Sequence, residues 1–259
     1  MTKETTDRFN SFLDVINVSE GFLKISKALD GFCNWYTSNA DTIASCIEGF
    51  IDFGIWGSAI KKLEDKQIVF TDDITSELAK EIYDADDVDA IVEQYYFQNF
   101  EERMSLLIDR CQQSSQVIEY QNLYSQIISA YRMTHYHLAC IGLFAMLDGI
   151  LADISNLITT NYKKRLNIIE RKLCDNIKLS EIDRRTLCIY STIKSFDTSI
   201  LCNSDLSGNE PNSLNRHWTL HGRAKREYSK YDFLKILLYI DAIIFLSNTI
   251  KKHEKSITV

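Results

Sequence analysis

The chain has 259 residues, of which 45% are hydrophobic and 25% are charged, the balance of a folded globular protein rather than a disordered one. A single proline and nine glycines exclude collagen-like and low-complexity chains and argue against a turn-rich all-β fold, so long helices are expected. Residues 1–110 carry 10 basic and 22 acidic side chains, whereas residues 111–259 carry 19 basic and 14 acidic ones. Only the second half therefore suits a polyanionic partner.

The first hundred residues show short amphipathic patterns. Hydrophobic residues three and four positions apart predict helices over residues 5–30 and 41–53, through Leu78 to Ile82, and from Val92 to Phe100. Two glycines and a mixed periodicity indicate an irregular connection over residues 53–73. At its end, Thr71, Asp72 and Asp73 are suitable N-caps for the helix through Leu78.

The helical pattern is stronger from residue 103 onward. It predicts helices over residues 103–131, 134–158, 161–176, 181–196 and 231–251. Ser180 with Asp183 resembles a capping box that opens the fourth of these. The segment 202–213 holds the only proline and the densest turn chemistry. We predict an all-α fold with an N-terminal helical region over residues 1–105 and a helical bundle over residues 106–255.

Two apolar stretches, residues 138–151 and 233–246, are the candidates for membrane spans. Each has 14 residues and includes charge, whereas a span needs about 20 apolar residues, so both are predicted to be buried core helices. The first ten residues lack the basic region and apolar run of a signal peptide. Seven cysteines form no CxxC pair, which is typical of reduced thiols. We therefore expect a cytoplasmic protein that does not span a membrane.

The residues with the clearest chemistry follow the turn-rich segment. Arg216, His217 and His221 lie within six positions, and we expect Arg216 in the exposed first turn of a short helix, where backbone N–H groups favour anions. Histidine exchanges protons near neutral pH, and a guanidinium stays charged and can hold two phosphate oxygens. Arg216 and His221 point about 140° apart on an ideal helix, so the arginine has to swing back toward a shared phosphate. The following basic residues, Arg223, Lys225 and Arg226, suit phosphate contacts.

These residues resemble the motif of the HEPN superfamily. In that motif an arginine, a polar residue (here His217) and a histidine after four to six intervening positions (here His221) stand at the start of a late helix. The string LNRHWTLHG, and an apolar helix that ends in Asp148, Gly149 and Ile150, are similar to a subgroup of larger bacterial HEPN proteins. The resemblance covers about residues 110–255.

The resemblance implies a metal-independent endoribonuclease that needs no cofactor and forms a homodimer. It implies that His221 acts as general base or acid, that Arg216 stabilises the transition state, and that His217 assists. The products are expected to be a 2′,3′-cyclic phosphate and a 5′-hydroxyl. Many relatives are toxins or phage-defence effectors with a partner such as an antitoxin. Others are non-catalytic modules that bind RNA, nucleotide or a protein, and this is the alternative function.

Several further residues have two interpretations each. The functional one is RNA contact for Asn215, His135, His137 and Tyr228, and orientation of the active-site arginine or histidine for Asp148. The structural one is helix capping for Asn215, capping or packing for the histidines, helix packing for Tyr228, and a contact between helices for Asp148. Trp218 is predicted to be a core or interface anchor rather than a platform for base stacking.

A metal site is the remaining chemical alternative. His217 and His221 are four positions apart and share a helix face, as chelating pairs do. However, no HExxH motif occurs and no cysteine lies at ligand spacing from the histidines, so we predict no metal. The acidic first half is expected to be a solvated surface, with coverage of the basic site as the alternative.

Overall fold

The computed structural model describes residues 42–159, 161–176 and 183–257, and all regular secondary structure within these ranges is helical. The helix expected over residues 5–30 lies outside them. The α-helices are α3 (Thr42–Asp65), α4 (Ser76–Asp84), α5 (Val88–Gln113), α6 (Ser115–Ile118), α7 (Gln121–Arg132), α8 (Tyr136–Ser155), α9 (Tyr162–Asn176), α10 (Arg184–Ser195), α11 (Arg216–Leu220) and α12 (Lys230–Ile257). A short 3-10 helix, η2 (Phe196–Thr198), follows α10. The all-α prediction is confirmed.

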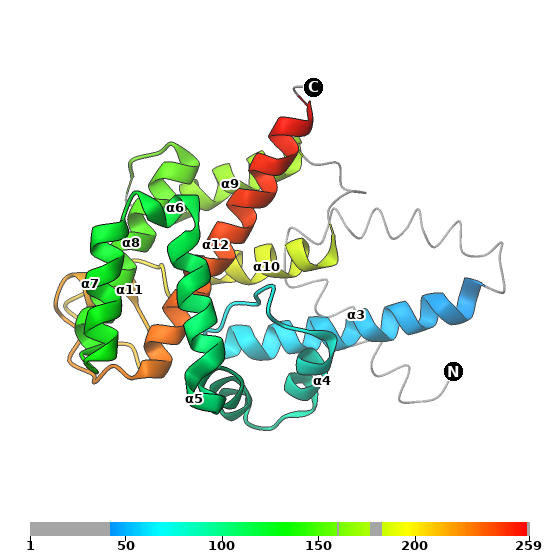
Figure 1. The fold of residues 1–259 in the computed structure, drawn as a ribbon, viewed down its shortest axis with the longest axis horizontal. Coiled ribbons are helices and arrows are strands. Elements are labelled where there is room, and N and C mark those ends of the chain that lie inside the picture. The colour runs from blue at the N-terminus through cyan, green and yellow to red at the C-terminus, as the bar shows by residue number, and fades with distance from the viewer. Residues whose placement is uncertain (1–41, 160, 177–182, 258–259) are drawn as a thin grey trace.

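The C-terminal helix α12 forms the centre of the fold. It runs diagonally through the molecule and packs against α5, α8, α9 and α10 (Figure 1). Its apolar residues face neighbours on most sides, and Phe233, Leu237 and Ile240 are fully buried. Buried residues from α3 to α12 belong to one hydrophobic core, and the division expected at residues 105 and 106 lies inside α5.

The helices α8 and α12 extend beyond the apolar stretches 138–151 and 233–246. By length and composition alone, Tyr136–Ser155 and Lys230–Glu254 are each sufficient to cross a membrane, so the sequence-based argument that these segments are too short was wrong. Half of the apolar window of α8 and 78% of that of α12 are buried inside the protein. Such burial is typical of core helices.

Three local predictions are corrected. Residues 53–65 continue α3 rather than forming an irregular connection, because Trp56, Ala59, Ile60 and Leu63 place a helical stripe in the core. The N-cap of α4 is Thr75, whose side chain accepts the N–H of Leu78. The helix expected over 103–131 is divided into α5, α6 and α7, because Ser114 stops α5 and caps α6.

Other boundaries follow the sequence closely. α9 begins at Tyr162, and α10 begins after Asp183, whose carboxylate accepts the N–H of Thr186 at 2.7 Å. Ser180, the other half of the expected capping box, lies outside the described residues. Among the described residues, Cys111, Cys140 and Cys202 carry free thiols.

A shared arginine joins the first part of the chain to the last. Arg110 on α5 donates two hydrogen bonds to Asp73, at 2.7 Å each, and two to Asp241 on α12, at 2.8 Å each. Asp241 is buried, and burial raises the pKa of its carboxyl even with Arg110 against it. This one guanidinium therefore fixes the segment before α4 against the central helix.

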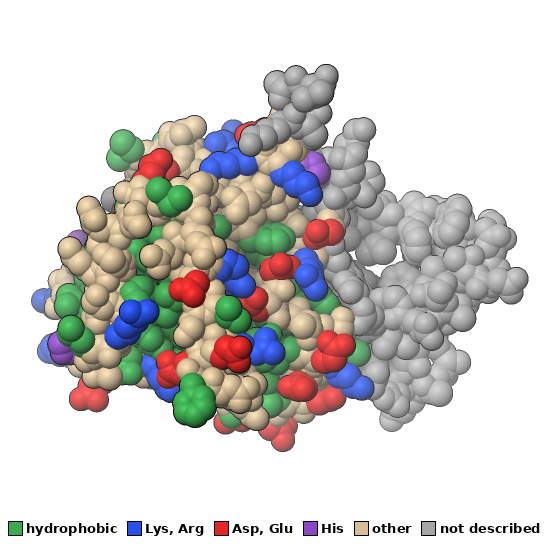
Figure 2. All heavy atoms as spheres, viewed as in Figure 1, with side chains coloured by type: hydrophobic (Ala, Val, Ile, Leu, Met, Phe, Trp, Pro, Cys, Tyr) green, Lys and Arg blue, Asp and Glu red, His purple; other side chains and the backbone are tan. Residues whose placement is uncertain are grey.

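The surface over α4 and the start of α5 is acidic. Its exposed carboxylates are Glu77, Glu81, Asp84, Asp86 and Asp87. Figure 2 shows acidic and basic side chains interspersed over this part of the molecule. The solvated face expected from the composition is therefore present here, and the contacts of these helices are with the core.

Glu64 makes stability depend on pH. Burial raises the pKa of its carboxyl from 4.5 to about 7. Between these values the folded chain holds a proton that the unfolded chain has lost, so stability falls as pH rises through the window. Glu64→Gln is therefore expected to stabilise the protein by about 2–3 kcal/mol at pH 8 and to change little below pH 4.5. Urea unfolding at a series of pH values measures this, and parallel curves for both proteins would contradict it.

Candidate functional site

The short helix α11 presents the motif residues. Asn215 is its N-cap: the side-chain oxygen accepts the N–H of Trp218 at 3.1 Å, and its amide nitrogen faces the carbonyl oxygens of Ser199 and Cys202. Asn215 is only 5% exposed. The observed contacts of Asn215 are therefore those of a helix cap, which was its structural interpretation. Trp218 is also buried, as expected of a core anchor.

The two imidazoles of the motif face each other. The rings of His217 and His221 are 4.6 Å apart between centroids and nearly perpendicular, at 85°. His217 is half-buried, and its Nδ1 lies 2.9 Å from the carbonyl oxygen of Ser204. His221 is exposed at the C-terminal end of α11. One imidazole is thus held by the backbone while the other is open to solvent.

Arg216 is buried, in contrast to the expected exposed turn. Its guanidinium lies over the ring of Tyr162, 4.3 Å from the centroid, and Nη2 donates to Oδ1 of Asn203 at 3.1 Å. Nε has no hydrogen-bond partner, and Arg216 makes no ion pair with any carboxylate in the described part of the chain. Arg216 is buried because its side chain turns inward toward α9 instead of outward from α11.

Asp148 supports this arginine through an intermediate residue. The hydroxyl of Tyr162 donates to the Asp148 carboxylate, and Nη1 of buried Arg165 donates to the same oxygen at 2.7 Å. Burial, followed by the bond to Asp148, raises the pKa of the Tyr162 hydroxyl. Asp148 thus joins α8 to α9 and also holds the ring on which the Arg216 guanidinium lies.

A pair of consecutive loop residues brings the arginine and the imidazoles close. Asn203 contacts the Arg216 guanidinium, and Ser204 contacts His217. Consecutive Cα atoms are about 3.8 Å apart, so the guanidinium and the His217 ring lie on neighbouring positions of one segment. Arg216 and His217 therefore contact one loop segment, through Asn203 and Ser204 respectively, and His221 contacts the ring of His217.

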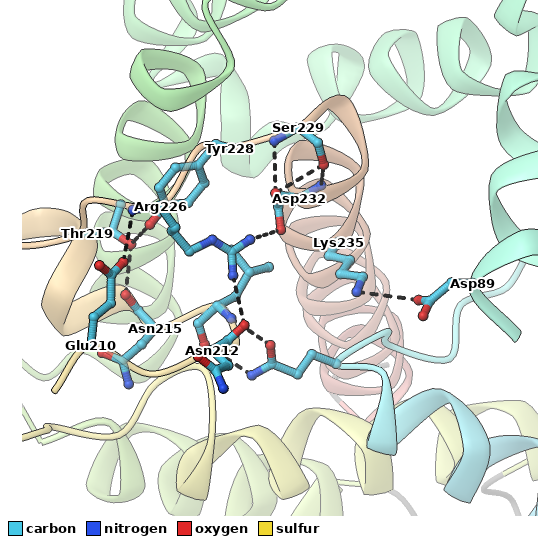
Figure 3. A network of polar contacts seen from close by, with 12 residues as sticks. Asp89, Glu210, Asn212, Asn215, Thr219, Arg226, Tyr228, Ser229, Asp232 and Lys235 are labelled. Carbon is cyan, nitrogen blue, oxygen red and sulfur yellow. Dashed lines mark hydrogen bonds and ion pairs between the residues drawn. The ribbon is translucent and has the colours of Figure 1, made fainter. Parts of the chain in front are cut away.

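The basic residues after α11 differ in their surroundings. Arg223 donates from Nη2 to the carbonyl oxygen of Leu206 at 2.9 Å. Arg226 is turned inward, where it pairs with Asp232 and lies over the ring of Tyr228 (Figure 3). Lys225 is exposed, and its ammonium makes no hydrogen bond or ion pair with the residues that the structure describes. Of the three, Lys225 is the most available to a ligand.

The histidines at the start of α8 line a separate hollow. His135, His137, Lys225 and Tyr228 contribute to an open depression of about 520 Å³. The ring of His137 meets Tyr228 edge-on at 4.6 Å, and the Tyr228 hydroxyl lies 2.6 Å from Oγ1 of Thr219 on α11. The hollow is thereby connected to α11 through Tyr228.

Four residues of this region were not anticipated from the sequence: Tyr162, Arg165, Asn203 and Glu210. Asn203 and Glu210 lie in the turn-rich segment 202–213, which was the only local signal, whereas Tyr162 and Arg165 are identified only by their contacts with distant parts of the chain. Comparisons of the chain with protein-family models, with curated proteins and with solved structures find no match. Within the described ranges, no group of three or more histidine, cysteine or acidic side chains is arranged to hold a metal ion.

Proposed function

We propose that the protein is a metal-independent endoribonuclease, with residues 106–255 as a HEPN-like bundle. The proposal is supported by the resemblance around Arg216 and His221 and by one observation of the site. Two imidazoles lie 4.6 Å apart on α11, and the guanidinium of Arg216 on the same helix is buried and has no carboxylate partner in the described chain. Asn203 and the Tyr162 ring contact this guanidinium but do not neutralise its charge, and a phosphate oxygen is a suitable anionic partner.

The proposed chemistry needs only these side chains. His221 takes the proton of a ribose 2′-hydroxyl, and the resulting oxygen attacks the adjacent phosphorus. The bond to the 5′-oxygen breaks, and that oxygen receives a proton from an imidazolium, either His217 or His221 of a second copy. Arg216 stabilises the negative charge that develops on the phosphate. The products are a 2′,3′-cyclic phosphate and a 5′-hydroxyl.

The accessory residues have graded roles in this proposal. Lys225, Arg223, His135 and His137 contact the RNA backbone or bases, because they are exposed or line the open hollow. Asp148 positions Tyr162 and thereby Arg216. Arg226, Tyr228 and Asn215 point inward, and their contacts hold in place the segments around the site. We further propose a cytoplasmic homodimer that acts in defence or stress with a partner such as an antitoxin.

One observation favours the alternative, a non-catalytic HEPN-like module that binds RNA, nucleotide or a protein. Arg216 is only 7% exposed, so its guanidinium meets a phosphate only after a local rearrangement. A binding module would use His221 and Lys225 at the surface and keep Arg216 as a structural residue. The two functions differ in whether the RNA is cut.

The deciding experiment is cleavage of total RNA in EDTA, with chemical mapping of the product ends. The purified protein is expected to cut RNA without added metal and to leave 2′,3′-cyclic phosphate and 5′-hydroxyl ends. A His221→Ala protein purified in parallel controls for contaminating ribonuclease. Intact RNA at every protein concentration, together with measurable RNA binding, would favour the non-catalytic alternative.

A further inference from the structure

The loop over residues 203–212 contacts two guanidinium groups and one imidazole of the proposed site, and also the backbone that follows α11. Asn203 accepts from the Arg216 guanidinium, Ser204 contacts His217, and the carbonyl of Leu206 accepts from Arg223. Farther along, the Glu210 carboxylate accepts the backbone N–H groups of Lys225 and Arg226, at 2.8 and 3.3 Å (Figure 3). The acceptors within these contacts are oxygen atoms of one continuous segment.

The same groups could be contacted by the phosphodiester backbone of RNA. A phosphate is bound by guanidinium groups and by consecutive backbone N–H groups, and the Glu210 carboxylate already lies on such a pair of N–H groups. The same loop contacts the Arg216 guanidinium through the side chain of Asn203, a residue that is itself exposed.

We propose that residues 203–212 are an autoinhibitory strap whose oxygens occupy the positions where RNA phosphates bind. This inference rests on the proposed function and adds regulation of the same site. RNA has to displace the strap from Arg216, Arg223 and the backbone of residues 225–226 before cleavage. The strap sets the activity of the resting protein, and a partner that pulls the loop away activates it.

Glu210→Gln tests the strap with little change in volume. The substitution removes the negative charge that accepts the backbone N–H groups of Lys225 and Arg226. The loop therefore opens more often, and hydrogen exchange at these two backbone amides is expected to become faster. Glu227→Gln is the matched control: it removes the same charge beside the same basic segment, from an exposed carboxylate that makes no hydrogen bond or ion pair with described residues. Binding of a fluorescent 2′-deoxy oligonucleotide, which cannot be cleaved, is measured for both.

If the strap is autoinhibitory, the Glu210→Gln protein is expected to bind the oligonucleotide about three- to tenfold more tightly than the Glu227→Gln protein. The reason is that the charged hydrogen bonds of the loop no longer compete with those of the oligonucleotide phosphates. Equal affinities of the two variants, or unchanged exchange at Lys225 and Arg226, would overturn it. A fully folded protein that shows the expected exchange but neither binds nor cuts nucleic acid would instead overturn the proposed function. The two failures are therefore distinguishable.

Discussion

His221→Ala is expected to lower the rate of RNA cleavage by roughly 10²–10⁴-fold, the usual contribution of one positioned proton-transfer group. His221 is exposed at the end of α11, and its ring contacts the ring of His217. Its backbone N–H bonds to the carbonyl oxygen of His217 and is kept in the variant. The free energy of unfolding should therefore change by less than about 0.5 kcal/mol, as for other surface substitutions.

The control for this loss is His253→Ala, which removes an imidazole from α12 outside the proposed site. Initial cleavage rates in EDTA and urea unfolding curves are measured for both variants and for the unaltered protein. Cleavage by the His221→Ala protein at the original rate would remove the proposed mechanism. An equal loss in both variants would show that the effect is not specific to the α11 imidazole.

Arg110→Ala is expected to lower the free energy of unfolding by about 2–3 kcal/mol, below the roughly 3–5 kcal/mol of a fully buried pair, because Asp241 is buried but the Arg110 side chain is 42% exposed. The guanidinium holds Asp73 and Asp241 at once, and Asp241 is only 5% exposed. Without Arg110, the buried carboxylate of Asp241 has to remain charged without its partner or take up a proton. Because burial already raises its pKa, the loss should be smaller at acidic pH than at pH 8.

A surface ion pair provides the matched comparison. Arg185 pairs with Asp72 at 2.8 Å, but both side chains are nearly half exposed, so Arg185→Ala should cost about 0–1 kcal/mol. Asp241→Asn in the Arg110→Ala protein should recover part of the lost stability, because no unpartnered buried charge is left. Similar effects of Arg110→Ala and Arg185→Ala in urea unfolding would show that the burial of Asp241 adds nothing to the contribution of a surface pair.

Local pattern was sufficient for much of the fold. α8, α9, α10 and α12 were found because their hydrophobic periodicity or caps lie within a few neighbouring residues. The predicted helix ended at residue 53, whereas α3 continues to Asp65. Two glycines interrupt the hydrophobic stripe through Trp56 and Leu63, and the stripe was recognised only from its burial in the core. The division at Ser114 was missed because a single serine cap interrupts an otherwise continuous helical pattern.

The sequence by itself determined the all-α class and the spacing that puts His217 and His221 on one helix face, because these depend on residues within about one helical turn. It left Asn215 open between a helix cap and an RNA contact. Only the tertiary structure decided that Arg216 turns toward Tyr162, that Asp148 acts through that tyrosine, and that Glu210 binds the backbone of residues 225–226. A side chain's direction and partner depend on which distant segments fold against it. The candidate residues of α11 could therefore be identified in the sequence, whereas their contacts with the 203–212 loop could not.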